Sequence, residues 1–451
     1  MVEKNNEYIV DIIDNGYEGE GIAKIDGFTI FIPGAIKGEK IKILIVKVLS
    51  SHAFGKILEI IEKSKDRVNS DCTTYKRCGG CKLRHIKYEK TLKMKQNAVQ
   101  SLVNKTLKNK IKVEETLGME NPYHYRNKAQ FPVGKSKDGR IITGFYAGRT
   151  HSIIENRDCA LGVTRNKEVL DRVIAHMEKF HIQPYDENTG KGLVRHVLIR
   201  YGFFTDEMMV CLIINGENLP GEEALVKSLR QIPEAVSVMV NVNKKRNNVI
   251  LGEKVRLLWG QPYITDKIGE ISYQISPLSF FQVNPYQTGR LYGKALEYAQ
   301  LKGEENVWDL YCGIGTISLF LAKAVPQGKV VGVEIVPEAV ENARENAKLN
   351  GFENVSFRCG AAEDVAPGLL EKYGADVVVV DPPRKGCDEK CLETMLRMEP
   401  DRIVYVSCDP ATLARDLKIL CGGGYALRKV RPVDQFGHTT HVETVVLLSK
   451  G

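Results

Sequence analysis

Short runs in which apolar and polar residues alternate occupy the first sixty positions of the chain. They read YIVDII, GIAKI, FTIFI, KIKILIVKV and FGKILEII, with glycines and a proline between them. Alternation with a period of two predicts strands that bury one face. Asp26 and Gly27, between the second and third runs, are a two-residue hairpin signal. Five such strands predict a small closed β-barrel over residues 1–61.

Apolar runs between residues 62 and 263 predict a central domain built on a mixed sheet. The runs are YRNKAQFPV, IITGFYAG, RHVLIRYGF, EMMVCLIIN and SVMVNVNK. A helical pattern rich in lysine begins at Tyr88 and ends near Leu107. It lies within residues 88–112, which we expect to pack on the domain that follows.

Strands and helices alternate from Ile264 onward, which predicts parallel βαβ units over residues 264–451. The run ADVVVVDPPRKG contains four consecutive valines, as expected for a strand buried on both faces. Asp409 and Pro410 predict the cap and first residue of a helix. Two final β runs, YALRKVRPV and HVETVVLLS, are expected to close the sheet.

Length and composition place the chain among globular proteins. Its 451 residues, 43% of them hydrophobic, are enough for two to four domains. There is no basic-then-apolar signal pattern at the N-terminus, and no run approaches the roughly 18 apolar residues of a membrane helix. We therefore expect a cytoplasmic protein that does not enter a membrane. Its eleven cysteines are then expected to be thiols, metal ligands or catalytic groups rather than disulfides.

The net charge of +8 is unevenly distributed. Residues 63–112 contain 15 Lys or Arg and 3 Asp or Glu, a local excess of 12. Such a block is typical of proteins that bind a phosphate backbone, and a solvated lysine-rich helix face is the alternative. Further along, Tyr123, Tyr125, Arg126 and Lys128 have the chemistry to stack on and neutralise a single strand, although the tyrosines fit edge-strand packing equally well.

The segment VWDLYCGIGTISLFL, residues 307–321, combines an apolar strand, a turn at Gly313 and Gly315, and an apolar helix. Glycines let the backbone approach a ligand and present free N–H groups to it. Glu334 ends the next apolar strand about 20 residues later, where a carboxylate accepts hydrogen bonds from ribose hydroxyls. The turn lacks the third glycine of the dinucleotide fingerprint, which favours a smaller nucleoside such as S-adenosylmethionine. We expect a Rossmann-like α/β domain around it.

Glu334, Asp381 and Cys408 each end a predicted strand, where open α/β sheets place their sites. Cys408 directly precedes a helix, and we expect the helix dipole and free N–H groups to favour its thiolate. The alternative is a small buried core residue. That alternative is what we expect of Cys211, Cys312, Cys359 and Cys421.

Asp381 begins the motif Asp-Pro-Pro-Arg. Asp-Pro-Pro followed by an aromatic residue marks enzymes that methylate exocyclic amines, but Arg384 stands in that place, so chemistry at a ring carbon fits better. A pyrimidine C5 accepts a methyl group only after a thiolate adds to C6, and a base must then remove the C5 proton. Glu443, in HVETVV, is the candidate base, although its position alone favours a solvent-facing strand residue.

Cys72, Cys78 and Cys81 form a C-x5-C-x2-C cluster. Two thiolates separated by two residues can converge on one ion, and the glycines between them permit the tight turn. Three close cysteines favour metal binding over chance free thiols. Cys159 is our candidate for the fourth ligand because it is the only other cysteine before Cys211. Zinc and an iron–sulfur cluster use the same residues, so both remain open on spacing alone.

Several motifs together resemble one known family. SCDPATLARDL, HVETVVLL, DPPRKG, FFQVN and DLYCGIGTISL are similar to the motifs of the RNA (uracil-5-)-methyltransferases. The N-terminal pattern resembles the TRAM domain, an OB-like RNA-binding barrel, although the pattern alone fits an unrelated barrel or interaction module equally well. The barrel and the cysteine cluster extend the resemblance, over almost the whole chain, to the subgroup that acts on 23S ribosomal RNA.

The resemblance implies roles for particular residues. Cys408 would be the nucleophile and Glu443 the proton-abstracting base. Contacts with S-adenosylmethionine are implied for Gln282, Tyr311, Glu334 and Asp381. A [4Fe-4S] cluster with a structural, RNA-facing role is implied for Cys72, Cys78, Cys81 and Cys159. Thr316 stands where some relatives have asparagine, so no contact is assigned to its side chain.

The expected architecture is therefore a TRAM barrel at 1–61, a mixed cluster-binding domain at 62–263 and a Rossmann-like class I methyltransferase domain at 264–451. We expect methylation of uracil C5 in 23S ribosomal RNA, with no obligate protein partner. One alternative is a transfer RNA uridine-5 methyltransferase, against which the extra barrel and cysteine cluster argue. The other is a non-catalytic iron–sulfur protein that binds RNA in assembly or sensing.

Overall fold

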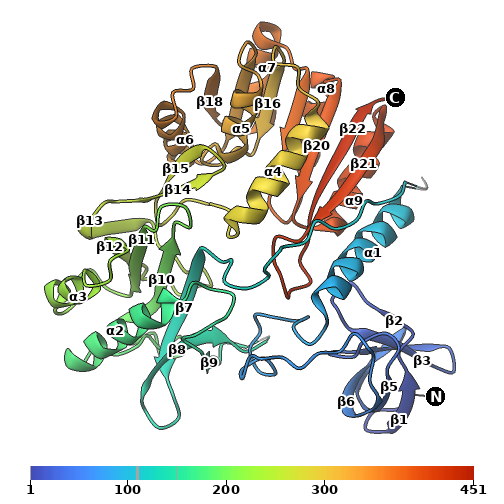
Figure 1. Cartoon of the computed structure of the whole chain (residues 1–451), viewed down its shortest axis with the longest axis vertical. Helices are drawn as coiled ribbons and strands as arrows, with labels where there is room; N and C mark the ends of the chain where they lie inside the picture. Colours follow the sequence, from blue (N-terminus) through green and yellow to red (C-terminus); the bar gives the residue numbers. More distant parts are fainter. Residues whose placement is uncertain (1, 108–110, 149) are drawn as a thin grey trace.

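The computed structural model describes residues 2–107, 111–148 and 150–451. Figure 1 shows an N-terminal sheet, a central sheet and a C-terminal sheet flanked by helices, with helix α1 beside the C-terminal sheet. Among these residues, no helix is both long enough and apolar enough to cross a membrane.

The N-terminal sheet has six strands in the order β1-β5-β6-β4-β3-β2. They are β1 (Glu7–Asp11), β2 (Asp14–Asn15), β3 (Gly21–Ile25), β4 (Phe28–Ile32), β5 (Lys40–Val48) and β6 (His52–Glu62). The predicted hairpin is confirmed: Asp26 and Gly27 have positive φ, and Ile25 pairs with Phe28. One more strand forms than the pattern predicted, because the two-residue β2 follows directly after the first run. Closure of this sheet into a barrel stays a prediction.

The central sheet is mixed, as predicted, because β11 and β12 pair in parallel and the other neighbours pair antiparallel. Its order is β13-β12-β11-β10-β7-β8-β9. The strands are β7 (Lys128–Lys135), β8 (Ile141–Tyr146), β9 (Ile153–Glu155), β10 (Val194–Tyr201), β11 (Met208–Ile214), β12 (Ala235–Val242) and β13 (Lys254–Gly260). Helices α2 (Arg165–Lys179) and α3 (Glu222–Leu229) pack their apolar sides on one face of it. A separate hairpin, β14 (Ile264–Ile268) and β15 (Ile271–Ile275), follows.

The C-terminal sheet has the order β18-β17-β16-β19-β20-β22-β21. Its strands are β16 (Asn306–Leu310), β17 (Lys329–Glu334), β18 (Val355–Cys359), β19 (Val377–Val380), β20 (Arg402–Ser407), β21 (Tyr425–Val433) and β22 (Glu443–Lys450). Its helices are α4 (Pro285–Ala299), α5 (Thr316–Ala324), α6 (Pro337–Leu349), α7 (Ala362–Tyr373), α8 (Glu389–Met398) and α9 (Pro410–Gly422). The first five strands are parallel and the two final β runs, β21 and β22, close the sheet, as the pattern predicted. The structure adds that these last two strands are antiparallel. Because β16 lies between β17 and β19, the chain reverses its direction of travel there, which opens a crevice at the carboxyl ends of the strands.

Helix α1 (Tyr88–Thr106) belongs by packing to the C-terminal sheet. Its buried Val99 and Val103 join the apolar cluster on that sheet's outer face, and α1 contacts α9 and β21. The remainder of the expected 88–112 segment includes 108–110, which lie outside the described residues. This packing places the start of α1 beside the loop that leads into β22.

Several cationic side chains of the basic block, residues 63–112, form ion pairs within the protein. Among its described residues, five cations have carboxylate partners: Arg67 with Glu39, Lys82 with Glu18, Arg84 with Asp71, Lys90 with Asp66 and Lys95 with Asp434. Lys95 and Asp434 are both buried. The excess charge of the segment therefore overstates what is free to meet a phosphate backbone.

Candidate active site

The glycine turn follows β16 at the crevice. Tyr311, Gly313 and Gly315 all have positive φ, so the chain turns sharply between β16 and α5. A Cβ at Gly313 would meet nothing within 4 Å, whereas one at Gly315 would lie 3.0 Å from the Phe357 ring. Gly313 thus leaves open space for a ligand above the turn, and Gly315 allows the helix to pack closely.

Glu334 closes this turn from the neighbouring strand. Its carboxylate accepts a hydrogen bond from the Gly313 N–H at 3.1 Å and another from the Val336 N–H at 3.0 Å. The carboxylate is therefore held at the carboxyl end of β17, beside the open space above Gly313, where a ribose would be bound.

Asp309 is a functional candidate that the sequence analysis missed. It is buried in β16, and the Ser318 hydroxyl donates to one of its oxygens while the other oxygen has no partner in the described chain. Burial raises the pKa of Asp309 to about 7, and the nearby Asp381 and Glu334 add to the rise. The available signal was a lone charged residue inside the apolar run VWDLY.

The other predicted cofactor contacts lie around the same crevice. Gln282 is buried before α4, and its side-chain amide makes no hydrogen bond to any described residue. The Tyr311 ring instead packs toward α8, where its hydroxyl approaches the Cys391 thiol. Thr316 has its hydroxyl 2.9 Å from the hydroxyl of Tyr292, so an internal partner already occupies it.

Cys408 and Glu443 lie together at the carboxyl end of the sheet. Cys408 follows β20, Glu443 begins β22, and Ser407 and Thr444 pair across these antiparallel strands. The two groups interact electrostatically, and both also interact with Asp381, which follows β19. Three chemically active groups therefore lie at the ends of three neighbouring strands and interact electrostatically.

The expectation that Cys408 is held ionised is wrong for the free protein. Burial raises the pKa of its thiol to about 12, and the carboxylates of Glu443 and Asp381 add to the rise. The first-turn N–H groups of α9, expected to stabilise a thiolate, are taken by Asp409, which accepts from Ala411 at 2.9 Å and Thr412 at 3.0 Å. The cap was predicted correctly, but the Asp409 carboxylate occupies N–H groups that the Cys408 sulfur would need for stabilisation of its thiolate.

Glu443 is buried rather than solvent-facing, with only 2% of its surface exposed. Burial raises the pKa of its carboxyl well above the ordinary value, Asp381 raises it further and Arg384 lowers it. Its Oε2 atom has no hydrogen-bond partner among the described residues. Buried polar atoms normally have hydrogen-bond partners, so a carboxyl oxygen without one, near a thiol, marks a candidate site for a bound substrate.

Arg384 is a second candidate that the sequence analysis left without a role. Its exposed guanidinium lowers the pKa of both Cys408 and Glu443. It makes no side-chain hydrogen bond or ion pair within the described parts of the chain. The motif DPPRKG marked its position, but only the fold brings it beside residues from β20 and β22.

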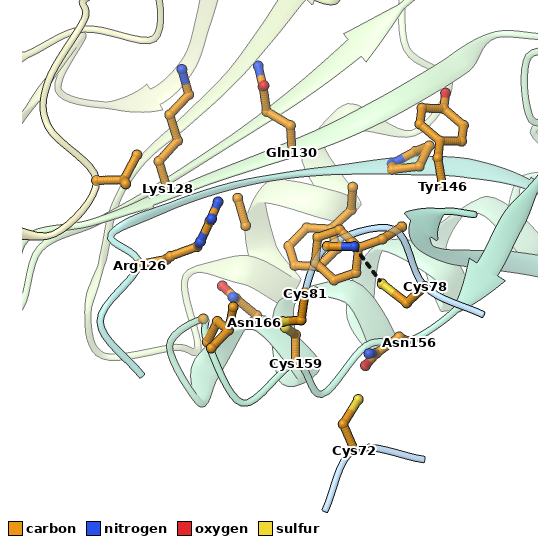
Figure 2. Close-up of a pocket in the computed structure, with 18 of the residues that line it drawn as sticks. Cys72, Cys78, Cys81, Arg126, Lys128, Gln130, Tyr146, Asn156, Cys159 and Asn166 are labelled. Atoms are coloured by element: carbon orange, nitrogen blue, oxygen red, sulfur yellow. Dashed lines mark hydrogen bonds between the residues drawn. The ribbon is translucent and has the colours of Figure 1, made fainter. Parts of the chain in front are cut away.

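Four cysteines line a second site, a pocket of about 430 Å³ in the central domain. They are the predicted Cys72, Cys78, Cys81 and Cys159, drawn in Figure 2. The Gly80 N–H donates to the Cys78 sulfur at 3.4 Å. Across residues 2–107, 111–148 and 150–451, no three His, Cys, Asp or Glu side chains are arranged to hold a single metal ion.

Cationic side chains also line the pocket. Arg84 and Arg126 line it, and the buried Nε atom of Arg126 has no hydrogen-bond partner among the described residues. Lys128 also lines it, and burial together with Arg200 lowers the pKa of its amine to about 7. Burial raises the pKa of the Cys78 and Cys81 thiols, whereas Arg84 and Arg126 lower that of Cys81. The two arginines therefore favour the thiolate form in which cysteine binds a metal.

The remaining cysteines differ from one another. Cys211 and Cys312 are buried, as expected for core residues. Cys359 is exposed at the end of β18, so the expectation of burial is wrong there, and Cys421 is only partly buried. The strand pattern predicted the element but not that its last residue emerges from the sheet.

The reversal of strand order at β16, the glycine turn and the carboxylate at the end of β17 define the C-terminal unit as a class I S-adenosylmethionine-dependent methyltransferase domain. Residues 87–451 match the family described as tRNA (Uracil-5-)-methyltransferase, and residues 2–58 match the TRAM domain. The chain belongs to this RNA (uracil-5-)-methyltransferase family and carries a TRAM domain.

Similar proteins cover the whole chain. An uncharacterized RNA methyltransferase of Halalkalibacterium halodurans is 49% identical over 99% of this chain and 98% of its own, and one of Clostridium acetobutylicum is 48% identical over 100% and 98%. Among solved structures, the tRNA (uracil-54, C5)-methyltransferase of Pyrococcus abyssi, in complex with S-adenosyl-L-homocysteine, is 27% identical with a TM-score of 0.79. That match covers 98% of this chain and 99% of the other. The protein is thus an RNA methyltransferase that uses S-adenosylmethionine.

Proposed function

We propose that this enzyme methylates C5 of a uridine in 23S ribosomal RNA through covalent addition of Cys408 to C6. The proposal rests above all on the juxtaposition of the Cys408 thiol with the unpartnered carboxyl of Glu443 at the crevice. Gln282, Tyr311, Glu334 and Asp381 are proposed to contact the methyl donor. The Tyr311 ring is directed toward α8, so the proposed contact would be made by the part of Tyr311 that lies in the turn.

The proposed chemistry balances without another reactant. The Cys408 thiolate forms a bond to C6, and the displaced electrons of the C5–C6 double bond make an enolate at O4. C5 then attacks the methyl group of S-adenosylmethionine, and S-adenosylhomocysteine departs. The Glu443 carboxylate removes the C5 proton, and the returning electron pair restores the double bond and expels the thiolate.

The raised pKa of Glu443 suits the base role. A carboxylate whose pKa lies above its ordinary value holds a proton more strongly and accepts the C5 proton more readily. Arg384 opposes this rise and also favours the Cys408 thiolate. Burial shifts both groups toward their protonated forms in the free protein. We therefore infer that both give up their protons when RNA enters and alters their surroundings, so that a thiolate and a carboxylate are present for the reaction.

Covalent trapping tests the mechanism. RNA that carries 5-fluorouridine at the target should become attached to Cys408, because a fluorine at C5 cannot be removed as a proton. The adduct should survive denaturing electrophoresis and be found by mass spectrometry on the peptide that contains Cys408. An adduct formed equally by Cys408→Ser would exclude this nucleophile.

A second variant separates the two catalytic roles. Glu443→Gln should transfer the methyl group to ordinary uridine RNA and then accumulate a stalled protein–RNA adduct, since the C5 proton stays in place. Ordinary turnover by this variant would remove Glu443 from the role of base. Unchanged binding of S-adenosylmethionine would show that the variant keeps its fold.

Transfer RNA is the second candidate substrate, and the similarity to the Pyrococcus abyssi enzyme favours it. That similarity spans nearly both full chains, so the N-terminal domain does not by itself argue against transfer RNA. Methyl incorporation into unmodified 23S ribosomal RNA and unmodified transfer RNA, compared at equal concentrations, separates the two. We expect incorporation into 23S ribosomal RNA. Mapping of 5-methyluridine in that RNA would then identify the modified position.

We further propose that Cys72, Cys78, Cys81 and Cys159 hold a [4Fe-4S] cluster. Support comes from four thiols around one pocket that Arg84 and Arg126 also line. Such a cluster would supply a rigid cross-link between chain segments, and no step of the methylation passes through it. RNA binding with no S-adenosylmethionine-dependent product would instead support a non-catalytic sensor or assembly protein.

A further inference from the structure

The loop between β2 and β3, residues 16–20, belongs to the TRAM domain and contacts the catalytic domain. The Gly16 N–H donates to the Glu20 carbonyl at 2.7 Å, and the Gly19 N–H donates to the Gly16 carbonyl at 3.0 Å, so the loop is tight. A Cβ placed on Gly19 would lie 2.8 Å from Leu83 and 3.0 Å from Thr440. A residue with a Cβ would be too close to these two side chains, and the positive φ of Gly19 is a second reason why this position favours glycine.

Polar contacts fix the same arrangement. Lys82 pairs with Glu18 at 2.5 Å, and the backbone N–H groups of Lys82 and Leu83 both donate to the His438 carbonyl at 3.0 Å. His438 lies in the loop between β21 and β22, which in Figure 1 descends from the C-terminal sheet toward the N-terminal part of the chain. Three segments far apart in the sequence therefore meet at the approach to β22.

Tyr17, at the tip of this loop, lies at the mouth of the active site. Its phenol interacts electrostatically with Asp409, Cys408 and Arg384, and its side chain is 38% exposed. Burial raises the pKa of its hydroxyl to about 12, with a further rise from Asp409. A half-exposed aromatic ring from another domain is thus held beside the candidate nucleophile.

The groups around Tyr17 also indicate its depth. Cys408 interacts with Tyr17 on one side and with Glu443 and Asp381 on the other. Tyr17 is 38% exposed, Cys408 is partly buried and Glu443 is 2% exposed. Exposure to solvent therefore falls in the order Tyr17, Cys408 and Glu443. A uracil between the thiol and Glu443 would lie deeper than the Tyr17 ring.

We propose that Tyr17 forms a stacking subsite for the nucleobase next to the target uridine in the RNA strand. The proposal rests on the proposed uridine chemistry at Cys408 and adds a TRAM residue to the rim of that site. An enzyme that acts on a base in folded RNA must first remove it from its stack, and the neighbouring base then loses a stacking partner. An aromatic ring at the pocket mouth can replace that partner whatever the neighbouring base, because every base has a π-face.

Three variants test the subsite. Tyr17→Ala removes the ring, Tyr17→Phe keeps the ring without the hydroxyl, and Leu58→Ala is the control because it truncates an exposed apolar residue elsewhere in the TRAM domain. The probes are 23S ribosomal RNA and transfer RNA transcripts in which 5-fluorouridine replaces uridine. The measurement is the second-order rate constant for covalent attachment, with S-adenosylmethionine binding recorded in parallel.

Stacking predicts that Tyr17→Ala slows attachment by about 10-fold to 100-fold, the loss expected when one base-stacking ring is truncated. Tyr17→Phe and Leu58→Ala should stay within about 3-fold of the unaltered enzyme, and all variants should bind S-adenosylmethionine equally. Equal rates for Tyr17→Ala and the unaltered enzyme would overturn the subsite. A loss in Tyr17→Phe as large as in Tyr17→Ala would also overturn it, since the hydroxyl would then be the active group.

A fluorescence measurement adds a readout specific to stacking. Once the target is mapped, 2-aminopurine is placed next to it in a synthetic RNA hairpin, and stacking on Tyr17 should quench its emission on binding. Tyr17→Ala should bind without this quenching, and quenching retained by Tyr17→Ala would contradict the subsite. Absence of any covalent product with the unaltered enzyme would instead refute the proposed function itself, which keeps the two failures distinct.

Discussion

At the scale of single residues, the site is defined by groups whose protonation the fold alters. Cys408 and Glu443 are both shifted toward their protonated forms, by burial first and by the proximity of Asp381 second. Arg384 acts in the opposite direction on both. The free enzyme is thus expected to keep its nucleophile as an unreactive thiol.

Alkylation of Cys408 should therefore be slow at neutral pH. Because the thiolate is the reactive form and the pKa is about 12, we expect Cys408 to react with iodoacetamide at least about 100-fold more slowly at pH 7.5 than an ordinary free thiol. The rate should rise about tenfold per pH unit up to at least pH 9.5. Mass spectrometry of the Cys408 peptide gives the rate, and exposed Cys359 is the internal reference. A rate that levels off below pH 8 would contradict the raised pKa.

Glu443 should make folding stability fall as pH rises. Its pKa is raised on folding, so its stabilising contribution is complete below the ordinary value of 4.5 and is lost as pH rises through the higher folded value. Glu443→Gln cannot ionise and should gain stability over the unaltered enzyme at pH 8 to 9, on the order of 1 to 3 kcal/mol, with a smaller gain at pH 5. Urea unfolding without RNA measures this, with the exposed Glu304→Gln as control. A difference independent of pH would contradict the assignment.

At the scale of elements, helix α1 links the segment after the TRAM domain to the loop before β22. Lys95 of α1 donates to Asp434 at 2.5 Å, and the Tyr88 hydroxyl donates to the other oxygen of Asp434 at 2.6 Å. Gln435, next along this loop, bonds Thr288 of α4 at 2.8 Å. The loop that carries the chain into Glu443 is therefore held from both sides of the sheet.

Breaking the buried pair should destabilise the C-terminal unit. Lys95→Met leaves Asp434 without its cation, and we expect a loss of about 3 to 5 kcal/mol in the free energy of unfolding. The double variant Lys95→Met with Asp434→Asn should recover most of that loss, because no unpaired charge then remains buried. Exposed Lys93→Met is the matched control on the same helix. Equal losses in the single and double variants, measured by urea unfolding, would show that packing rather than charge is responsible.

At the scale of the whole molecule, distant segments meet at two places. Three cysteines of the pocket precede α1, and the fourth lies between β9 and α2 of the central sheet. The loop of residues 16–20 and the loop before β22 meet at the other place. Both contacts join the N-terminal part of the chain to the domains that follow it. We therefore expect each of them to affect how bound RNA is positioned relative to Cys408.

Removal of one cysteine should reveal the bound group. After anaerobic purification we expect a brown protein with about four iron atoms per chain, and Cys81→Ser should lose both iron and colour and melt several degrees lower. Binding of S-adenosylmethionine should change by less than about 3-fold, because the glycine turn lies in another domain. Exposed Cys359→Ser should keep its iron. A colourless protein with stoichiometric zinc would reject the cluster.

The amino-acid sequence was sufficient for features that local physics controls. The period-two runs, the Asp26–Gly27 hairpin, the buried valine strand and the Asp409 cap all formed as predicted, because each depends on neighbours a few residues away. The glycine turn and Glu334 were found for the same reason, since a strand, a turn and the next strand follow in order. Motifs of this kind also sufficed to indicate the family.

Only the tertiary structure decided the state and surroundings of the reactive groups. The burial of Glu443, the raised pKa of the Cys408 thiol and the approach of Tyr17 depend on contacts between segments that are tens to hundreds of positions apart. Sequence periodicity reports which face of a strand is apolar, but it does not report which remote charge will stand beside its end. Protonation depends on burial and on those remote charges, so it became visible only when the chain was folded.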